Sequence, residues 1–134
     1  MSAAFTAASN QSASKTSPTN IAPTDTLTIE AMVKVKSYRN ATIIGRNVAS
    51  YANGFRMGID AQGIINIYGY NGGTYRGATS LQSLPLNRWV HVTATLSMSA
   101  NTQAIYFDGV SVPISQGQSG IPATSINNAG EILS

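Results

Sequence analysis

The residues best suited to hold a ligand lie in one short stretch, residues 66–76, with the sequence NIYGYNGGTYR. Sugars are held by aromatic rings that stack on their C–H faces and by planar polar groups that hydrogen-bond neighbouring hydroxyls. The stretch offers both around a glycine-rich turn that lets a ligand approach the backbone. The candidate ligand-binding residues are Tyr68, Tyr70, Asn71, Tyr75 and Arg76. Tyrosines also suit ordinary β-strand faces, so a purely structural role for these rings stays open.

The acidic residues do not support catalysis. A retaining glycosidase needs two carboxyl groups about 5 Å apart across the scissile bond. The five acidic residues are far apart in the sequence, at Asp25, Glu30, Asp60, Asp108 and Glu131. Asp60 and Asp108 are accounted for by turns, Asp-Ala-Gln-Gly and Asp-Gly, that join successive apolar runs. We therefore predict a protein that is not an enzyme and has no catalytic residues.

The chain has one histidine, His91, and no cysteine, which argues against a Ser-His-Asp triad and against a zinc site. We expect His91 to be a structural residue hydrogen-bonded across the sandwich. The neighbouring Trp89 is expected to pack in the core or at its rim, and the alternative is that its ring is a platform for a sugar. Asp side chains and loop carbonyls could hold calcium, but no dense acidic loop supports such a site. The prediction is that no metal and no cofactor is bound.

Charge is low and scattered. Eight basic and five acidic residues give a formal net charge of +3, and charged residues make up 10% of the chain. Nucleic-acid binding would need a clustered basic footprint with interleaved aromatics. Lys34 and Lys36 instead alternate with apolar residues, as expected for the solvated face of a strand. We predict no nucleic-acid partner.

Targeting signals are sparse. No apolar run approaches the roughly 20 residues that span a bilayer, so no membrane insertion is expected. The first residues, MSAAFTAASNQSASK, lack the basic and apolar regions of a signal peptide. A surface built from Ser, Thr, Asn and Gln is common in extracellular adhesins and viral shell proteins. We expect a location outside the cell or on a virion surface, reached within a longer exported protein or by assembly into a virion.

Strands must position these residues, because apolar residues recur with a period of two. In TLTIEAMVKVK, residues 26–36, every second residue from Leu27 is apolar, and we expect the longest regular strand. Around Trp89, the residues Val90, Val92, Ala94 and Leu96 form a second inward face. Asp108-Gly109 predicts a two-residue hairpin turn. Further strands are expected at residues 4–6, 12–16, 41–46, 55–59, 64–70, 75–81, 104–107, 110–112 and 131–133.

The predicted architecture is an all-β, two-sheet antiparallel sandwich of jelly-roll type, forming a single domain over residues 1–134. A single sheet could not cover two apolar faces, so two sheets must pack together. After Pro113 the alternation decays into a Gly-, Ser- and Asn-rich sequence in which we expect only the short strand at 131–133. No segment has a helical period.

Four segments in this order resemble the laminin G-like branch of the concanavalin A-like lectin/glucanase sandwiches: TDTLTIEAMVKV, GFRMGIDAQGIINIY, LPLNRWVHVTATLS and AIYFDGVSV. Two departures stand out. Met32 occupies a position where the family usually has Trp, and the chain ends near the point where the family's last strand would begin. The resemblance implies a laminin G-like domain that lacks its final strand or completes the sandwich differently.

The resemblance implies a family whose members mostly bind glycans or proteins, and it does not imply catalysis. Our first hypothesis is a non-catalytic binding or adhesion module that recognises a glycan or a surface protein within a larger extracellular or viral assembly. The alternative is a structural virion decoration or fibre protein that contacts neighbouring subunits without binding sugar. An open sheet edge would favour the alternative, because it invites pairing with another chain.

Overall fold

Alternating residues build the first of two sheets, whose strand order is β2-β7-β8-β9. These strands are β2 (Thr26–Lys34), β7 (Trp89–Ser97), β8 (Thr102–Phe107) and β9 (Val110–Val112). The computed structural model describes residues 15–16, 22–47, 52–118, 123–128 and 132–133. Strands β2 and β7 pair in register from Thr26↔Ser97 to Lys34↔Trp89, so their two predicted inward faces lie side by side.

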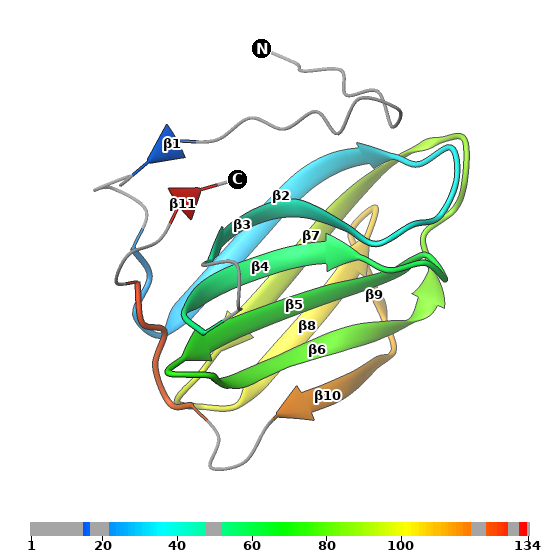
Figure 1. Cartoon of the computed structure of the whole chain (residues 1–134). Helices are drawn as coiled ribbons and strands as arrows, with labels where there is room; N and C mark the ends of the chain where they lie inside the picture. The colour runs from blue at the N-terminus through cyan, green and yellow to red at the C-terminus, as the bar shows by residue number, and fades with distance from the viewer. Residues whose placement is uncertain (1–14, 17–21, 48–51, 119–122, 129–131, 134) are drawn as a thin grey trace.

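The second sheet has seven strands in the order β1-β11-β3-β4-β5-β6-β10, and it lies in front of the first in Figure 1. All its pairings are antiparallel. Its strands are β1 (Lys15–Thr16), β3 (Ala41–Asn47), β4 (Gly54–Ile59), β5 (Ile64–Asn71), β6 (Thr74–Ser83), β10 (Ile114–Gln118) and β11 (Ile132–Leu133). The predicted jelly-roll sandwich is confirmed, and the described residues contain no helix.

The core fills the space between the sheets. Its fully buried side chains come from both layers: Met57, Ile65, Ile67, Ala78, Leu84, Val90, Val92, Ala94, Met98 and Ile105. Burial alternates along β7, where Val90, Val92, Ala94 and Leu96 are buried and the residues between them are not. This alternation confirms the predicted inward face of the central strand.

Two strand predictions differ from the structure. The ten-residue β6 is longer than the nine-residue β2, which was expected to be the longest strand. The sequence after Pro113 was expected to form no strand before residue 131, yet Ile114–Gln118 forms β10 along the edge of β6. Its sequence, ISQGQ, has little apolar alternation because β10 is an edge strand with no buried side chain, so no core face selects apolar residues. The expected strand at residues 4–6 lies outside the described residues.

One end of the sandwich, here called the Lys34 end, gathers the loops 35–40, 60–63, 84–88 and 108–109. The Tyr38 hydroxyl donates to the Leu84 carbonyl at 2.7 Å, and the Leu84 amide donates to the Gly63 carbonyl at 2.8 Å. The Asn87 amide donates to the Val35 carbonyl at 2.7 Å. These bonds connect loops from both sheets, so they fix the strands' relative positions.

Asp108 fastens the β8–β9 turn to the start of β7. Asp108 and Gly109 have φ angles of 50° and 78°, as the predicted two-residue turn requires. The His91 amide donates to Oδ1 of Asp108 at 2.8 Å, and Arg88 Nη1 lies 2.9 Å from Oδ2. The bond from the His91 amide has the larger effect and the bond from Arg88 the next largest, and both lower the pKa of Asp108 below its ordinary value of 3.8. The turn therefore depends on the ionised carboxylate.

We expect Asp108→Asn to lower the thermal unfolding midpoint at neutral pH and to have little effect in acid. A carboxylate with a lowered pKa stabilises the fold fully above its unfolded value of about 3.8, and this contribution disappears as the pH falls through the folded pKa. The gap between the wild-type and variant midpoints should close between about pH 5 and pH 2. Circular dichroism melts across this range measure it. A gap that persisted in acid would mean that the charge is not the cause.

Candidate functional site

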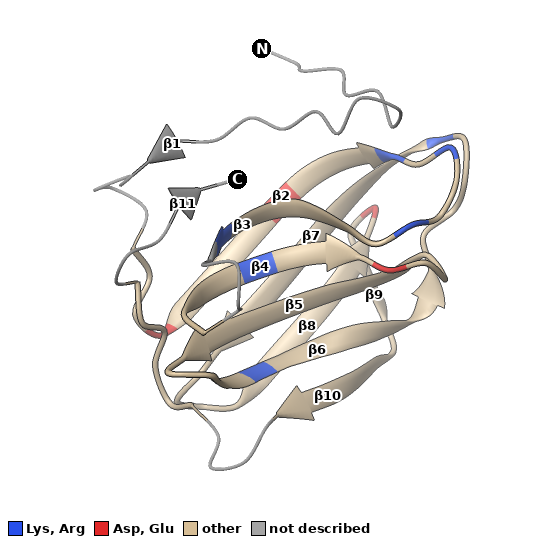
Figure 2. Ribbon diagram, viewed as in Figure 1, with Lys and Arg blue, Asp and Glu red and all other residues tan. Residues whose placement is uncertain are grey.

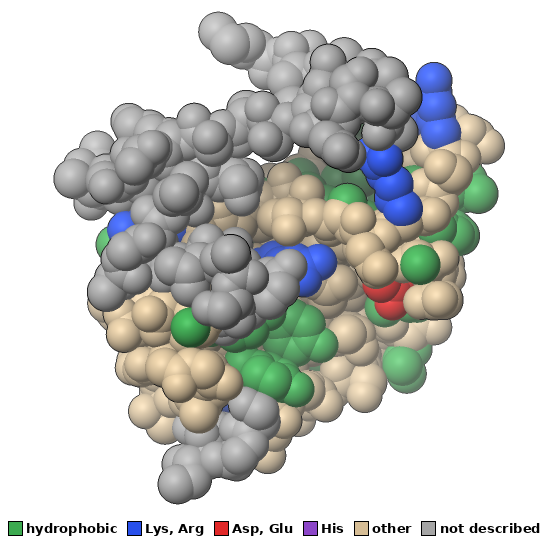
Figure 3. All heavy atoms as spheres, viewed as in Figure 1, with side chains coloured by type: hydrophobic (Ala, Val, Ile, Leu, Met, Phe, Trp, Pro, Cys, Tyr) green, Lys and Arg blue, Asp and Glu red, His purple; other side chains and the backbone are tan. Residues whose placement is uncertain are grey.

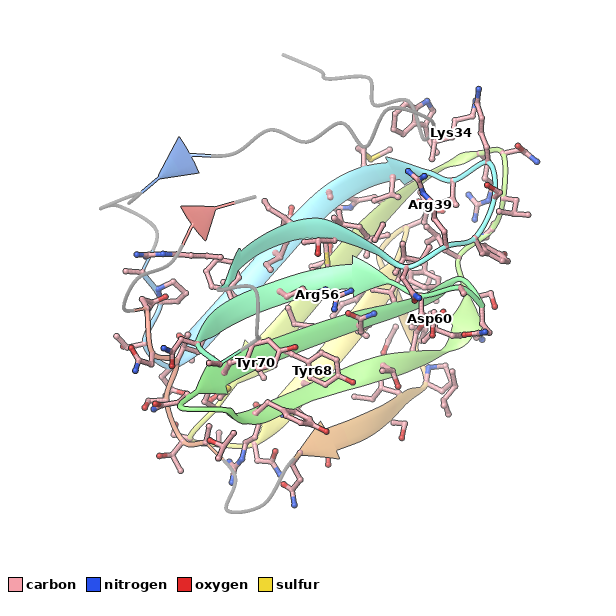
Figure 4. The ribbon with its side chains drawn as sticks, in the orientation of Figure 1. Lys34, Arg39, Arg56, Asp60, Tyr68 and Tyr70 are labelled. Carbon is pink, nitrogen blue, oxygen red and sulfur yellow. The ribbon has the colours of Figure 1, made fainter. Side chains whose placement is uncertain are left out.

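Three tyrosine rings gather on the outer face of the seven-stranded sheet, which faces the viewer in Figure 4. Tyr68 and Tyr70 alternate along β5 with the core residue Ile67, and Tyr70 pairs directly with Tyr75 on β6. The ring centroids of Tyr68 and Tyr75 lie 5.3 Å apart at 85°, and each lies 6.1 Å from the Tyr70 ring. We call Tyr68, Tyr70 and Tyr75 the tyrosine patch. Figure 3 shows green side chains in the middle of this face.

Glycines let the Tyr68 ring lie along the sheet. Gly77 pairs with Tyr68 across β5 and β6, and Gly117 on β10 pairs with Gly77. A Cβ atom added to Gly77 would overlap Tyr68 Cδ1, and one added to Gly117 would lie 3.3 Å from Tyr68 Cε1. The ring therefore extends across both glycines, whose missing side chains leave the space that it occupies. With Tyr75 at a steep angle beside it, the ring forms the floor of a shallow aromatic corner.

Arg56 supplies a planar cationic group next to this corner. It pairs with Tyr68 across β4 and β5, so the two side chains share the outer face, as their labels in Figure 4 show. A Cβ atom added to Gly58 would lie 2.7 Å from Arg56 Nη2, so the guanidinium lies along its own strand over Gly58. Such a group can form paired hydrogen bonds with hydroxyls or an acidic group.

Asn66 lies two residues before Tyr68 on β5, where it pairs with Gly58 of β4 and with Thr79 of β6. Its side chain is only 7% exposed, and its buried Oδ1 accepts no hydrogen bond in the structure. Buried amide oxygens nearly always have a donor, and leaving one without costs about 1–3 kcal/mol. The atom has almost no accessible surface, so a bound molecule would reach it only after neighbouring side chains moved.

The tyrosine patch is partly dehydrated already. Burial is the main cause that raises the pKa of Tyr68 above its ordinary value of 10.0; Tyr75 also raises it, and the Arg56 charge opposes the shift. The Tyr68 hydroxyl stays protonated at neutral pH and has no hydrogen bond to the described part of the chain. It can therefore donate to a ligand.

The structure brings together three of the five predicted site residues and separates two. Asn71 lies at the end of β5, where its Nδ2 donates to the Ser125 hydroxyl at 2.9 Å. Arg76 pairs with Gly69, on the inner side of the sheet, and its Nη1 donates to the Met98 carbonyl. Neither side chain joins the tyrosine patch, because successive strand residues point to opposite faces and Arg76 directly follows Tyr75.

Sequence reasoning missed Arg56 and the two glycines beneath Tyr68. Alternation could have found Arg56, because Phe55 and Met57 beside it are core residues and Arg56 must then face outward. The glycines gave no such signal, because only the pairing of β5, β6 and β10 shows which glycine lies under which ring.

The described acidic residues have structural partners. Asp60 Oδ1 accepts from the amides of Gln62 and Ile64 at 2.8 and 2.9 Å, which confirms its role in the turn. Asp25 accepts from the Ser99 amide and hydroxyl at 2.9 and 2.6 Å. Glu30 Oε2 lies 3.4 Å from His91 Nε2. Within the described ranges, no three His, Asp or Glu residues cluster as metal ligands.

One expectation about β7 was wrong, and another was wrong in part. His91 does not bond across the sandwich, because its side chain is on the outer face and its partner, Glu30, belongs to the adjacent strand β2. Trp89 does not pack in the core but is 59% exposed. Both residues alternate with buried valines, so their side chains must point outward.

Nowhere in the described ranges does a helix reach the length and hydropathy that crossing a bilayer requires.

Comparison with known proteins places the fold in a family. The sequence profile Laminin_G_3, described as the concanavalin A-like lectin/glucanases superfamily, matches residues 8–131. Among solved structures, a heptameric SAP-like pentraxin from Limulus polyphemus superimposes with a TM-score of 0.53 at 16% identity. That match covers 84% of this chain and 52% of the pentraxin chain, so the chain spans about half the length of that relative.

A second solved structure, the carbohydrate binding module CBM66 from Bacillus subtilis, gives a TM-score of 0.43 at 16% identity, over 92% of this chain and 70% of that one. None of the curated proteins compared by sequence matches. At 16% identity the likeness to the pentraxin supports the fold alone. Because the profile match extends over nearly the whole sequence, the chain belongs to the laminin G-like branch of the concanavalin A-like lectin/glucanases superfamily.

Proposed function

We propose that this protein is a non-catalytic binding module whose ligand is a glycan held on the tyrosine patch. The observation that carries the proposal is the aromatic corner, in which the Tyr68 ring lies over Gly77 and Gly117 and meets the Tyr75 ring at 85°. A sugar's C–H face can stack on such a ring while its edge hydroxyls reach the polar groups around it.

The polar groups beside the corner match the needs of a sugar. The Arg56 guanidinium lies beside the Tyr68 ring on the same face, and the Tyr68 hydroxyl can both donate and accept a hydrogen bond. A site with both donors and an acceptor suits sugar hydroxyls, which can accept and donate at once.

A glycan-array screen of the full chain tests the proposal. We expect binding to a restricted set of glycans and its loss in Tyr75→Ala, because this change removes the wall of the corner. Tyr106→Ala is the matched control, since Tyr106 is a half-buried tyrosine on β8 of the other sheet. Binding that survives Tyr75→Ala, or is lost equally in Tyr106→Ala, would contradict a site at the tyrosine patch.

We propose further that the module works outside the cell or on a virion surface, within a larger assembly. The support is compositional: charged residues make up only 10% of the chain, and the polar surface depends on Ser, Thr, Asn and Gln. Such a surface suits a scaffold that displays one recognition face while its other surfaces contact neighbouring subunits.

A further inference from the structure

The sequence contains two Asn-Gly pairs, and the fold brings them together at one end of the seven-stranded sheet. Asn71 is the last residue of β5 and Gly72 begins the turn to β6, whereas Gly54 is the first residue of β4 and follows Asn53. The Gly72 amide donates to Asn53 Oδ1 at 2.9 Å, so one pair contacts the other. Asparagine deamidates most readily before glycine, because glycine has no side chain to block attack by its own backbone nitrogen.

Deamidation is a reaction within the chain. The backbone nitrogen of the following residue loses its proton and attacks the asparagine Cγ, so that a new C–N bond forms and the side-chain nitrogen leaves as ammonia. Water then opens the cyclic succinimide at either of its two carbonyls, which gives aspartate or isoaspartate. The reaction therefore needs water, and a backbone nitrogen that can give up its proton and approach Cγ.

The fold protects the Asn53-Gly54 pair. Gly54 is buried, and its amide donates to the Asn127 carbonyl at 2.6 Å. Its backbone is also held within the sheet, because Gly54 pairs with Asn47 on β3 and with Tyr70 on β5. Attack on Asn53 Cγ would have to break the bond to Asn127 and move the start of β4.

The Asn71-Gly72 pair is open to water. Gly72 and Gly73 are exposed, and a Cβ atom added to either would have no heavy atom within 4 Å. Two side chains from outside the turn restrain the reacting groups. Asn53 Oδ1 holds the Gly72 amide through an exposed hydrogen bond, and the Ser125 hydroxyl accepts from Asn71 Nδ2 at 2.9 Å.

We propose that Asn71 is a site of spontaneous deamidation and that the Asn53 side chain sets its rate. The Gly72 nitrogen becomes a nucleophile only when it loses its proton, and the bond to Asn53 Oδ1 retains that proton. Because this bond is exposed and one partner is a side chain, it opens without any change in the sheet. The buried backbone bond of Gly54 has no such local opening.

The products would alter the hairpin beside the tyrosine patch. Residues 71–74 carry no charge, and the tip of the β5–β6 hairpin is tan in Figure 2, so either product introduces a carboxylate there. Isoaspartate also carries the main chain through Cβ, which adds a methylene to a turn whose ends, Asn71 and Thr74, are paired. The next pair is Tyr70↔Tyr75. In a consequence that rests on the proposed function, isoaspartate should weaken glycan binding by displacing these rings.

Incubation of the full chain at mildly alkaline pH, followed by tryptic peptide mass spectrometry, tests the proposal. Trypsin separates the two sites, because Arg56 lies between them in the sequence. We expect the Asn71 peptide to show the mass change that replaces NH₂ by OH, at a rate at least about tenfold higher than the Asn53 peptide. In guanidinium chloride the two rates should become similar, because both pairs are then unfolded Asn-Gly.

Variants of Asn53 test its control of the rate. Asn53→Ala removes the acceptor of the Gly72 amide and should speed deamidation of Asn71 by about twofold to tenfold, as expected for the loss of one hydrogen bond. Asn53→Asp is the matched control, because it keeps an acceptor, and Asn71 should react no faster there than in the wild type. Circular dichroism before incubation checks that each variant is folded, so that faster deamidation is not caused by unfolding.

Three results would overturn the proposal: no mass change at Asn71 in the folded chain, equal rates at Asn53 and Asn71 in the folded chain, or an unchanged Asn71 rate in folded Asn53→Ala. None of these measurements involves a glycan, so they are independent of the proposed function. Glycan binding that declines with incubation in the wild type but not in Asn71→Ser would then show that the modification acts on the tyrosine patch.

Discussion

Replacing Gly77 by alanine should destabilise the fold by about 1–3 kcal/mol, as overpacking of tightly filled sites usually does. The new Cβ atom would overlap the Ile67 carbonyl oxygen of β5 and Cδ1 of Tyr68. The ring can move, but the carbonyl belongs to the backbone of the sheet and cannot move without separating β5 from β6. Urea denaturation should show a lower midpoint with an unchanged slope, since the surface exposed on unfolding stays the same.

Gly117→Ala is the control for this variant. Its Cβ atom would lie 3.3 Å from Tyr68 Cε1, a tight contact with the side of a ring that can shift by a few tenths of an ångström. We expect a much smaller loss of stability there. Equal midpoints for Gly77→Ala and the wild type would contradict the close approach of β5 and β6.

Tyr68→Ala should leave the fold intact and weaken glycan binding by about tenfold to a hundredfold, which corresponds to roughly 1.4–2.8 kcal/mol. The side chain is half-buried on the outer face and takes no part in the core between the sheets. The variant removes the floor of the aromatic corner, and with it the stacking surface and the hydroxyl donor. Isothermal titration with a glycan identified on the array measures the effect.

Tyr68→Phe divides this effect between the ring and the hydroxyl. It keeps the ring over Gly77 and Gly117, so most of the affinity should remain, with a loss of about 0.5–1.5 kcal/mol if the hydroxyl donates to the ligand. If Tyr68→Phe bound as weakly as Tyr68→Ala, the ring would not be a stacking surface. If Tyr68→Ala bound as tightly as the wild type, the tyrosine patch would not be the binding site.

The fold could be predicted because the alternation of apolar and polar residues along its strands shows which side chains are buried. Every second residue of β2 and β7 is apolar, so the inward faces and the sandwich follow from sequence. Strand β10 could not be found in this way. Its sequence ISQGQ lies at an edge, half-buried at most, and its partner β6 holds it through the backbone.

The candidate site could be predicted only in part, for a geometric reason. Strand periodicity placed Tyr68 and Tyr70 on one face, and the turn at Asn71-Gly72-Gly73 brought Tyr75 opposite Tyr70. Sequence proximity suggested Arg76, but a step of one residue moves a side chain to the other face. Arg56 is twelve residues before Tyr68 and became its neighbour only through the register of β4 and β5.

The two ends of the described chain meet in one short ribbon. Lys15 pairs with Leu133 and Thr16 with Ile132, so β1 and β11 run antiparallel at the edge of the seven-stranded sheet (Figure 1). The outermost residues, Lys15 and Leu133, are paired with each other. Tension applied through both ends would therefore break the hydrogen bonds between β1 and β11 one pair after another, and not all at once. The ribbon should then separate at low force, before the core and the tyrosine patch are disturbed.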